Sequence, residues 1–109
     1  KDERKAVEWY QKAADQGYAA AQSNLGGMYE HGRGVAKDER KAVEWYQKAA
    51  DQGYTHAQNK LGAMYVDGKG VDKDERKAVA WYQKAADQGD INAQTKVKEL
   101  KELTKLLSK

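Results

Sequence analysis

The chain contains a long internal repeat whose copies are nearly identical. The string KDERKAV begins at Lys1 and recurs at Lys37 and Lys73, so the period is 36 residues. Residues 1–36 and 37–72 differ at only nine positions. A period in the mid-thirties without strand signals is typical of stacked helical hairpins, in which each unit buries its apolar face only against its neighbours.

Each copy predicts two helical segments separated by glycine turns. In the second copy the first segment runs from Glu39 to about Gln52, and Asp38 is a candidate N-cap. Gly53 suits its end, because glycine adopts a left-handed conformation at little cost. The second segment spans residues 55–67 and is closed by the GKGV turn at 68–71. The first segment shows the apolar spacing of an amphipathic helix at Ala42, Trp45, Tyr46, Ala49 and Ala50.

The two copies of the second segment differ on one side only. On a helical wheel the residues shared by both copies fall between about 80° and 240° from Ala20. We interpret this shared arc, which includes Leu25 and Leu61, as the packed face. The remaining arc, here called the variable arc, is predicted to form a continuous surface across successive hairpins. It holds Ala19, Ala20, Ser23, Asn24, Gly27, Glu30 and His31, and in the next copy Thr55, His56, Asn59, Lys60, Ala63, Val66 and Asp67.

Gly26 and Gly62 lie inside predicted helices, where glycine costs roughly 1 kcal/mol relative to alanine. Both fall on the shared arc. We expect the cost to be offset by close approach of a neighbouring helix, with Trp or Tyr filling the volume. The alternative is a glycine tolerated on a surface.

The repeated residues resemble the Sel-one-like repeat family, a relative of the tetratricopeptide repeat. The resemblance rests on AADQG at 49–53, Ala57-Gln58, Leu61-Gly62, Tyr65, GKGV at 68–71 and Trp81-Tyr82, and it covers essentially residues 1–98. It implies an all-α fold, a right-handed superhelical α/α solenoid of antiparallel helical hairpins. It also implies that the first helices line the concave side, here 19–31, 55–67 and the start of 91–107. The cysteine-rich branch of that family pins each hairpin with a disulfide, which this cysteine-free chain cannot form.

We divide the chain as a single repeat domain, 1–109. Residues 1–36 are repeat 1, 37–72 are repeat 2, 73–90 are the second helix of the last repeat, and 91–109 are a C-terminal capping helix. The helix at about 3–16 has no preceding partner, so we expect its face of Ala6, Trp9, Tyr10 and Ala13 to be partly uncovered. From this face we expect that the chain is a fragment of a longer array, or that an assembly covers this end. The face also offers a surface for self-association.

The C-terminal segment looks like a cap. Lys98 and Lys101 replace Gly62 and Tyr65, and polar residues suit a helix with no further repeat to pack on. Leu103, Leu106 and Leu107 extend this helix and either fold back on the array or meet a partner helix. Plain capping is the favoured interpretation.

Charge and composition argue against other classes of function. The net charge of +3 comes entirely from residues 73–109, which hold nine basic and six acidic side chains, and signs are mixed locally elsewhere. A protein that binds nucleic acid usually carries a basic stripe on one face. We therefore expect that this chain does not bind nucleic acid. No stretch approaches the roughly 18–20 apolar residues of a membrane helix. The sequence shows no signal-peptide pattern. It does not decide between a cytoplasmic protein and a periplasmic or secreted one.

No motif for catalysis or for a cofactor is apparent. Cysteine is absent, and His31 and His56 do not stand at metal-ligand spacing, so we expect no metal and no cofactor. The glycine pairs at 32–34 and 68–70 follow helices rather than strands, so we interpret them as turns and not as phosphate loops. No Ser-x-x-Lys nucleophile motif occurs. The chain is therefore not expected to be an enzyme.

The favoured function is a protein–protein interaction module that binds a peptide or protein partner on the concave helix face. The resemblance implies an adaptor, a host-interaction or an immunity-type role in bacteria. The alternatives are a structural or consensus-like repeat scaffold without a dedicated ligand and, less favoured, a β-lactam-binding or β-lactam-hydrolysing relative. Candidate partner-binding residues are Ala20, Ser23, Asn24, Gly27, His31, His56, Asn59, Lys60, Ala63, Asp67, Asn92, Thr95 and Lys96.

Overall fold

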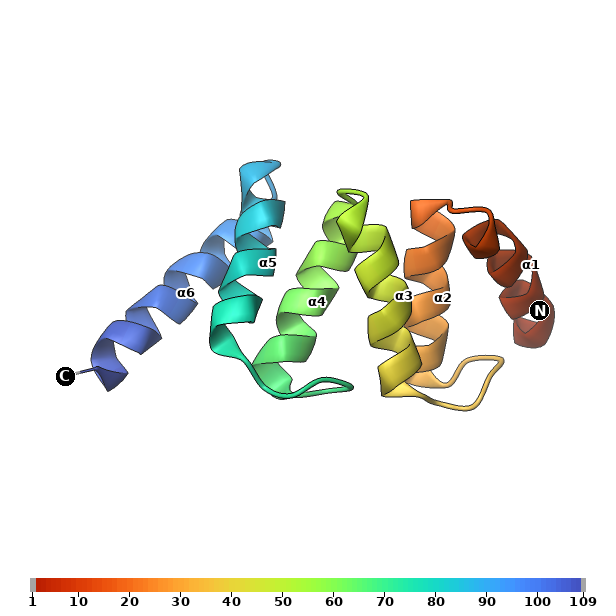
Figure 1. The fold of residues 1–109 in the computed structure, drawn as a ribbon, viewed down its shortest axis with the longest axis horizontal. Coiled ribbons are helices and arrows are strands. Elements are labelled where there is room, and N and C mark those ends of the chain that lie inside the picture. The colour runs from red at the N-terminus through yellow and green to blue at the C-terminus, as the bar shows by residue number, and fades with distance from the viewer. Residues whose placement is uncertain (1, 109) are drawn as a thin grey trace.

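A computed structural model describes residues 2–108, which form six α-helices and no strand. Each helix packs mainly on the helix before it and the helix after it, so the six form a single row (Figure 1). The row measures 51 × 26 × 21 Å, and its arrangement confirms the predicted α/α solenoid. The helices are α1 (Glu3–Asp15), α2 (Ala19–His31), α3 (Glu39–Asp51), α4 (Thr55–Asp67), α5 (Glu75–Asp87) and α6 (Ile91–Leu107).

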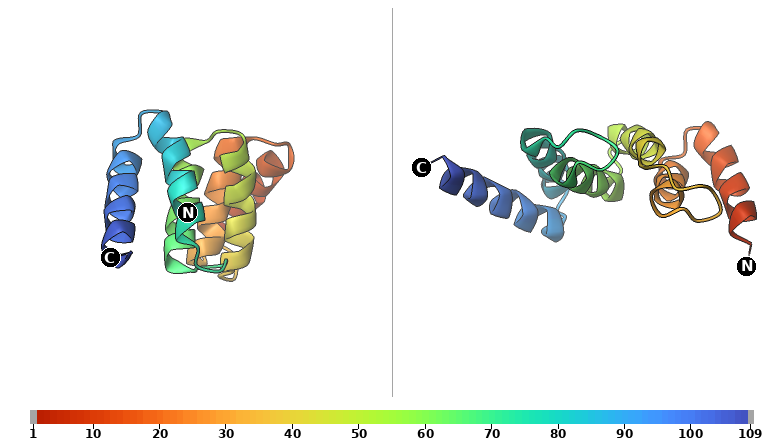
Figure 2. Two further views of the ribbon diagram at one scale, coloured as in Figure 1. Left: turned by 60° about the vertical axis from the view of Figure 1, so that its left-hand side comes forward. Right: turned by 90° about the horizontal axis from the view of Figure 1, so that it is seen from below.

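The helices alternate between two layers. Seen from below, α2 and α4 lie on one side of the row and α3 and α5 on the other (Figure 2). We call α2, α4 and α6 the A helices and α1, α3 and α5 the B helices. The predicted bounds of the A helices agree with the structure, and the B helices end within one residue of the predicted ends.

Side chains and glycines at the predicted places set the helix ends. The Asp38 carboxylate accepts a hydrogen bond from the Lys41 amide at 3.1 Å, which caps the first turn of α3. At the C-terminal ends of the A helices α2 and α4, Gly32 and Gly68 have φ values of 68° and 69°. This left-handed backbone turns the chain toward the next B helix.

The glycines on the shared arc allow a tyrosine ring to lie directly on the helix backbone. A Cβ atom on Gly62 would come within 2.7 Å of the Tyr82 ring, and one on Gly26 within 2.9 Å of the Tyr46 ring. The two rings are 6% and 1% exposed. The close approach predicted for these glycines is therefore confirmed, and tyrosine rather than tryptophan is the side chain that fills the volume.

A glutamine clasp provides a second contact that repeats. The amide of Gln52 donates to Oε1 of Gln22 at 2.8 Å, and Gln22 in turn donates to the Ala14 carbonyl at 3.1 Å. The same contact joins Gln88 to Gln58 at 2.8 Å. The clasp satisfies polar atoms of the buried amides of Gln22 and Gln58, and it links the ends of α3 and α5 to the A helices before them.

The first helix packs mainly on α2, so one of its faces is less covered than that of α3. The sequences of α1 and α3 are identical. Tyr46 of α3 is 1% exposed, whereas Tyr10 of α1 is only half-buried and Trp9 is 72% exposed. The expected uncovered face is therefore confirmed, and self-association through it stays a prediction.

The last helix is longer than the other A helices because it lacks their stop signal. Thr104 occupies the place of Gly32 and Gly68. A β-branched residue strongly disfavours the left-handed backbone, so α6 continues to Leu107. The three extending leucines do not fold back on the array, and Lys98 and Lys101 face solvent. Leu103, Leu106 and Leu107 are 45%, 66% and 72% exposed.

The tyrosine contact predicts opposite effects for the same substitution at two helical glycines, Gly62 on α4 and Gly27 on α2. Gly62→Ala should lower the free energy of unfolding by about 1–3 kcal/mol, because the Tyr82 ring must move away from the new methyl group. Urea denaturation followed by circular dichroism at 222 nm measures the change.

Gly27→Ala is the matched control. Its Cβ would lie 3.6 Å from the Tyr46 hydroxyl, an ordinary contact, and alanine already stands at the equivalent position 63. This variant should gain about 0.5–1 kcal/mol from helix propensity. Equal effects of the two substitutions would contradict the close-approach argument.

Candidate functional site

The exposed side of the A helices carries most of the residues predicted to bind a partner. We call this surface the A-helix face. Leu25 and Leu61 are fully buried, as the shared arc requires. Among the candidates, Gly27, Asn59, Lys60 and Ala63 are half-buried. Those that are exposed are Ala20, Asn24, His31, His56, Asp67, Asn92, Thr95 and Lys96.

Ser23 corrects the predicted exposure of the variable arc. It is 3% exposed and its hydroxyl has no hydrogen-bond partner among the described residues. Ser23 lies three residues before Gly26, the glycine on which the Tyr46 ring of α3 packs. We attribute its burial to its short side chain on this covered edge of α2. The longer Asn59 stands at the equivalent position and donates to the Asp90 carboxylate at 3.1 Å.

Three hollows follow one another along the A-helix face. The first, of about 340 Å³, crosses α2, and the second, of about 470 Å³, lies between α4 and α6. They share His56 and Lys60. The third, of about 160 Å³, shares Tyr82 and Lys96 with the second. All candidates except Ala20 and Thr95 line at least one of these hollows.

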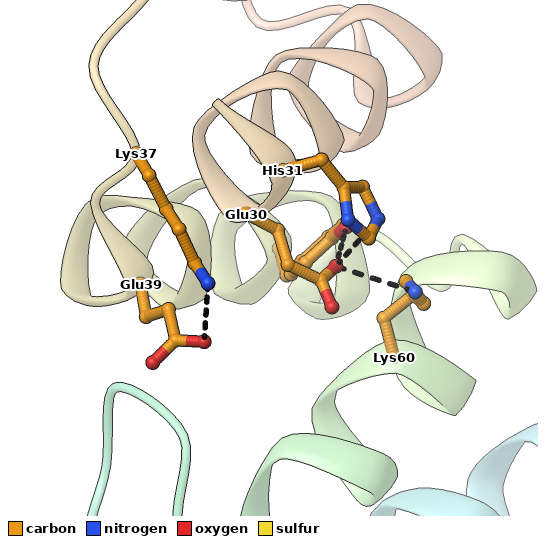
Figure 3. Close-up of polar contacts among 6 residues, drawn as sticks. Glu30, His31, Lys37, Glu39 and Lys60 are labelled. Carbon is orange, nitrogen blue, oxygen red and sulfur yellow. Dashed lines mark hydrogen bonds and ion pairs between the residues drawn. The ribbon is translucent and has the colours of Figure 1, made fainter. Parts of the chain in front are cut away.

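A charged cluster centred on Glu30 lies beside the first hollow. The Tyr46 hydroxyl donates to Oε1 of Glu30 at 2.7 Å, and Nζ of Lys60 lies 3.2 Å from the same oxygen. Nε2 of His31 lies 3.7 Å from it. Figure 3 shows His31 and Lys60 converging on Glu30 from α2 and α4. The cluster thus joins two repeats across the face.

The cluster shifts the pKa values of its members. Burial of the Glu30 carboxyl raises its pKa, but the hydrogen bond from Tyr46 and the charge of Lys60 together outweigh burial, so the pKa lies below its ordinary value. Burial and the Glu30 carboxylate both raise the pKa of the Tyr46 hydroxyl. Glu30 is therefore ionised and Tyr46 neutral near pH 7, and each stabilises that state of the other.

The cluster occurs once because the repeats differ here. Val66 stands at the place of Glu30, and Lys96, at the place of Lys60, lies 3.9 Å from Glu99 on its own helix.

Burial and the nearby Asp67 carboxylate raise the pKa of Tyr82. The first hollow is therefore bordered by a charged group, whereas the third is lined partly by aliphatic side chains. Glu30 lies on the variable arc, but it is not among the partner-binding residues predicted from the sequence.

Within residues 2–108 no cluster of His, Asp or Glu side chains could hold a metal ion. The glycine turns predicted at 32–34 and 68–70 are turns between an A helix and a B helix. None of the helices in the described part of the chain is long and apolar enough to cross a membrane.

Comparison with known proteins places the chain in a family. The model of the Sel1 repeat matches residues 1–18, 19–54 and 55–90. The chain belongs to the Sel1 repeat family. The period of the matches is the 36 residues found in the sequence, while their boundaries fall before the A helices rather than before the B helices. Sel1 repeats are generally protein-interaction modules.

Solved structures agree with this assignment. A Sel1 repeat protein from Oxalobacter formigenes is 45% identical, with a TM-score of 0.83 over 86% of this chain and 39% of its own. The protein c5321, a protective antigen of uropathogenic Escherichia coli strains, is 44% identical, with a TM-score of 0.83 over 84% of this chain and 20% of its own. Cysteine-rich protein B of Helicobacter pylori is 34% identical, with a TM-score of 0.80 over 84% of this chain and 68% of its own.

This chain therefore spans a fifth of the c5321 chain and about two fifths of the O. formigenes chain. A search of curated proteins gives no match.

The Glu30 cluster predicts a pH-dependent effect. Because the pKa of Glu30 is lower in the folded chain than in the unfolded one, its contribution to stability is present at neutral pH and is lost as pH falls through the folded value. Glu30→Gln should lower the free energy of unfolding by about 1–3 kcal/mol at pH 7. The difference from the parent chain should shrink toward pH 3.

Glu44→Gln is the control, since Glu44 is exposed on α3 and forms no ion pair within the described residues. Denaturation of the three proteins across this pH range makes the comparison. A constant difference between Glu30→Gln and the parent would show that the carboxylate charge does not matter.

Proposed function

We propose that the chain binds a peptide or protein partner on the A-helix face. The supporting observation is where the nearly identical repeats differ. The sequences of α1 and α3 are identical, whereas α2 and α4 differ at seven of their 13 residues. All seven lie on the variable arc. Between the first two repeats, divergence within helices is confined to one side of the A helices, and the B helix α5 differs from α1 and α3 only at Ala80. Such one-sided divergence suits a surface that contacts something other than its own fold.

The chemistry of this face suits a polypeptide ligand. Asn24, His56 and Asn92 are exposed and make no side-chain hydrogen bond among the described residues. Amide and imidazole groups offer both donors and acceptors to the main chain of an extended segment. The three contiguous hollows accept side chains of that segment, the first beside a charged group and the third against aliphatic residues.

The role we propose is non-catalytic. It is that of an adaptor, a host-interaction factor or an immunity-type partner, on the side of the solenoid that the family resemblance assigns to the concave surface. A scaffold without a dedicated ligand is the competing function, because near-identity at exposed positions such as Lys5, Lys41 and Lys77 fits recent duplication or consensus design.

A double substitution tests the proposal without disturbing the core. Asn24→Ala with His56→Ala removes two exposed side chains from the A-helix face. We expect a partner captured from native extract by the parent chain to lose at least tenfold in affinity, since two central polar contacts are lost. Isothermal titration with the purified partner measures the change.

The control variant carries Lys5→Ala and Lys69→Ala, two exposed residues on α1 and on the turn after α4. It should bind as the parent does. A partner that binds all three proteins equally would place binding elsewhere, and no saturable partner at all would favour the scaffold.

A further inference from the structure

A second surface lies apart from the A-helix face, between the beginning of α5 and the end of α6. The two helices diverge there (Figure 1). They enclose a slot of about 560 Å³ lined by Glu75, Arg76, Val79, Lys101, Thr104 and Lys105. Lys101, Thr104 and Lys105 belong to the later part of α6 and the other three to the first turns of α5.

The other two B helices show what covers the same site. On α3, Gly70 has a φ of 72°, and a Cβ there would clash with the Glu39 carbonyl oxygen. That Cβ would also come within 3.0 Å of Val43, and Val71 packs against the cluster that contains Val43. The turn after α4 therefore covers the first turns of α3 with a glycine followed by a valine.

The first repeat has the same arrangement. A Cβ on Gly34, whose φ is 72°, would clash with the Glu3 carbonyl and come within 2.9 Å of Val7. Val35 packs against the cluster that contains Val7. In both copies, therefore, a glycine followed by a valine occupies this site.

The third copy has the site but not the cover. Glu75, Arg76 and Val79 repeat the Glu, Arg and Val of the earlier B helices. Val7 and Val43 are 9% and 8% exposed, whereas Val79 is only half-buried. The cover is missing because α6 continues as a helix through Thr104, which carries the leucines at 106 and 107 away from α5.

We propose that the slot binds a partner protein through a turn that contains glycine followed by a branched aliphatic residue. The glycine is required because the backbone of the partner must approach the Glu75 carbonyl in a left-handed conformation. The aliphatic residue covers Val79. The cover on α3 continues with Asp72 and the one on α1 with Ala36. The slot is lined by three basic residues, Arg76, Lys101 and Lys105, and one acidic residue, Glu75, so an acidic residue after the aliphatic one is favoured.

The chain itself provides the probe. A cyclised peptide with the sequence of residues 67–73, DGKGVDK, is titrated to millimolar concentration into the full chain labelled at its methyl groups. We expect saturable NMR shifts of the Val79 methyl groups and none for Val7 and Val43, whose sites are already covered. The peptide with alanine in place of the glycine of position 70 should lose these shifts.

A grafted variant closes the argument. Thr104→Gly, Leu106→Gly and Leu107→Val make residues 104–107 identical to the GKGV turn at 68–71, because Lys105 already matches. This variant should end α6 after Leu103, cover its own slot, and no longer bind the peptide. The variant with Asn24→Ala and His56→Ala should bind the peptide as the parent does, which separates this surface from the A-helix face.

Three results would overturn the proposal. They are the absence of Val79 shifts at millimolar peptide, equal binding of the alanine peptide, and undiminished binding by the grafted variant. Shifts centred on Leu106 and Leu107 instead would show that the exposed leucines, and not the slot, take the peptide.

Discussion

The packing of a tyrosine ring on a glycine is the contact on which the array depends. Without a Cβ at Gly26 or Gly62, the ring of the following B helix lies on the A-helix backbone and is almost completely buried. This contact sets the distance between the two helices and uses one side of the A helix. The glutamine clasp joins the same pair of helices near the start of the A helix and the end of the B helix. What remains of each A helix is a side that packs less tightly, although Ala19, Ala63 and Val66 on it still contact the core clusters. The candidate site occupies this side.

The same tyrosine also links the core to the face. The ring of Tyr46 lies against Gly26, while its hydroxyl donates to Glu30, which pairs with Lys60 of the next repeat. A half-buried charge beside the first hollow is therefore held in place by a residue of the core. Tyr82 has no such partner on α4, because Val66 stands where Glu30 would be. The face is consequently uniform in backbone and varied in chemistry, a combination that suits selective recognition.

Periodicity predicted the fold class, the helix bounds and the division of the A helices into two arcs, because each of these depends on local sequence. The prediction that the whole variable arc is free of packing was wrong at Ser23, which is buried, and at Ala19, Ala63 and Val66, which pack partly against core clusters. A helical wheel cannot show how far a neighbouring helix covers the edge of an arc. The Glu30 cluster was missed because its members are 16 and 30 residues apart and pair only when repeats are stacked. The slot on α5 could have been found from the sequence, since Thr104 stands in register with Gly32 and Gly68 but is not a glycine.

The identity of α1 and α3 has a consequence for how the chain finds its order. Interchangeable segments allow alternative registers in which a helix docks one unit away from its proper place, and natural repeat arrays are prone to such errors. Contacts that occur only once remove this degeneracy. The hydrogen bond Asn59–Asp90 forms only when α4 stands beside α6, because Ser23 and Tyr54 occupy the equivalent positions one repeat earlier. The pair Glu30–Lys60 likewise joins α2 to α4 alone, since Val66 replaces Glu30 in α4. The few residues that differ between repeats thus specify which hairpin packs beside which.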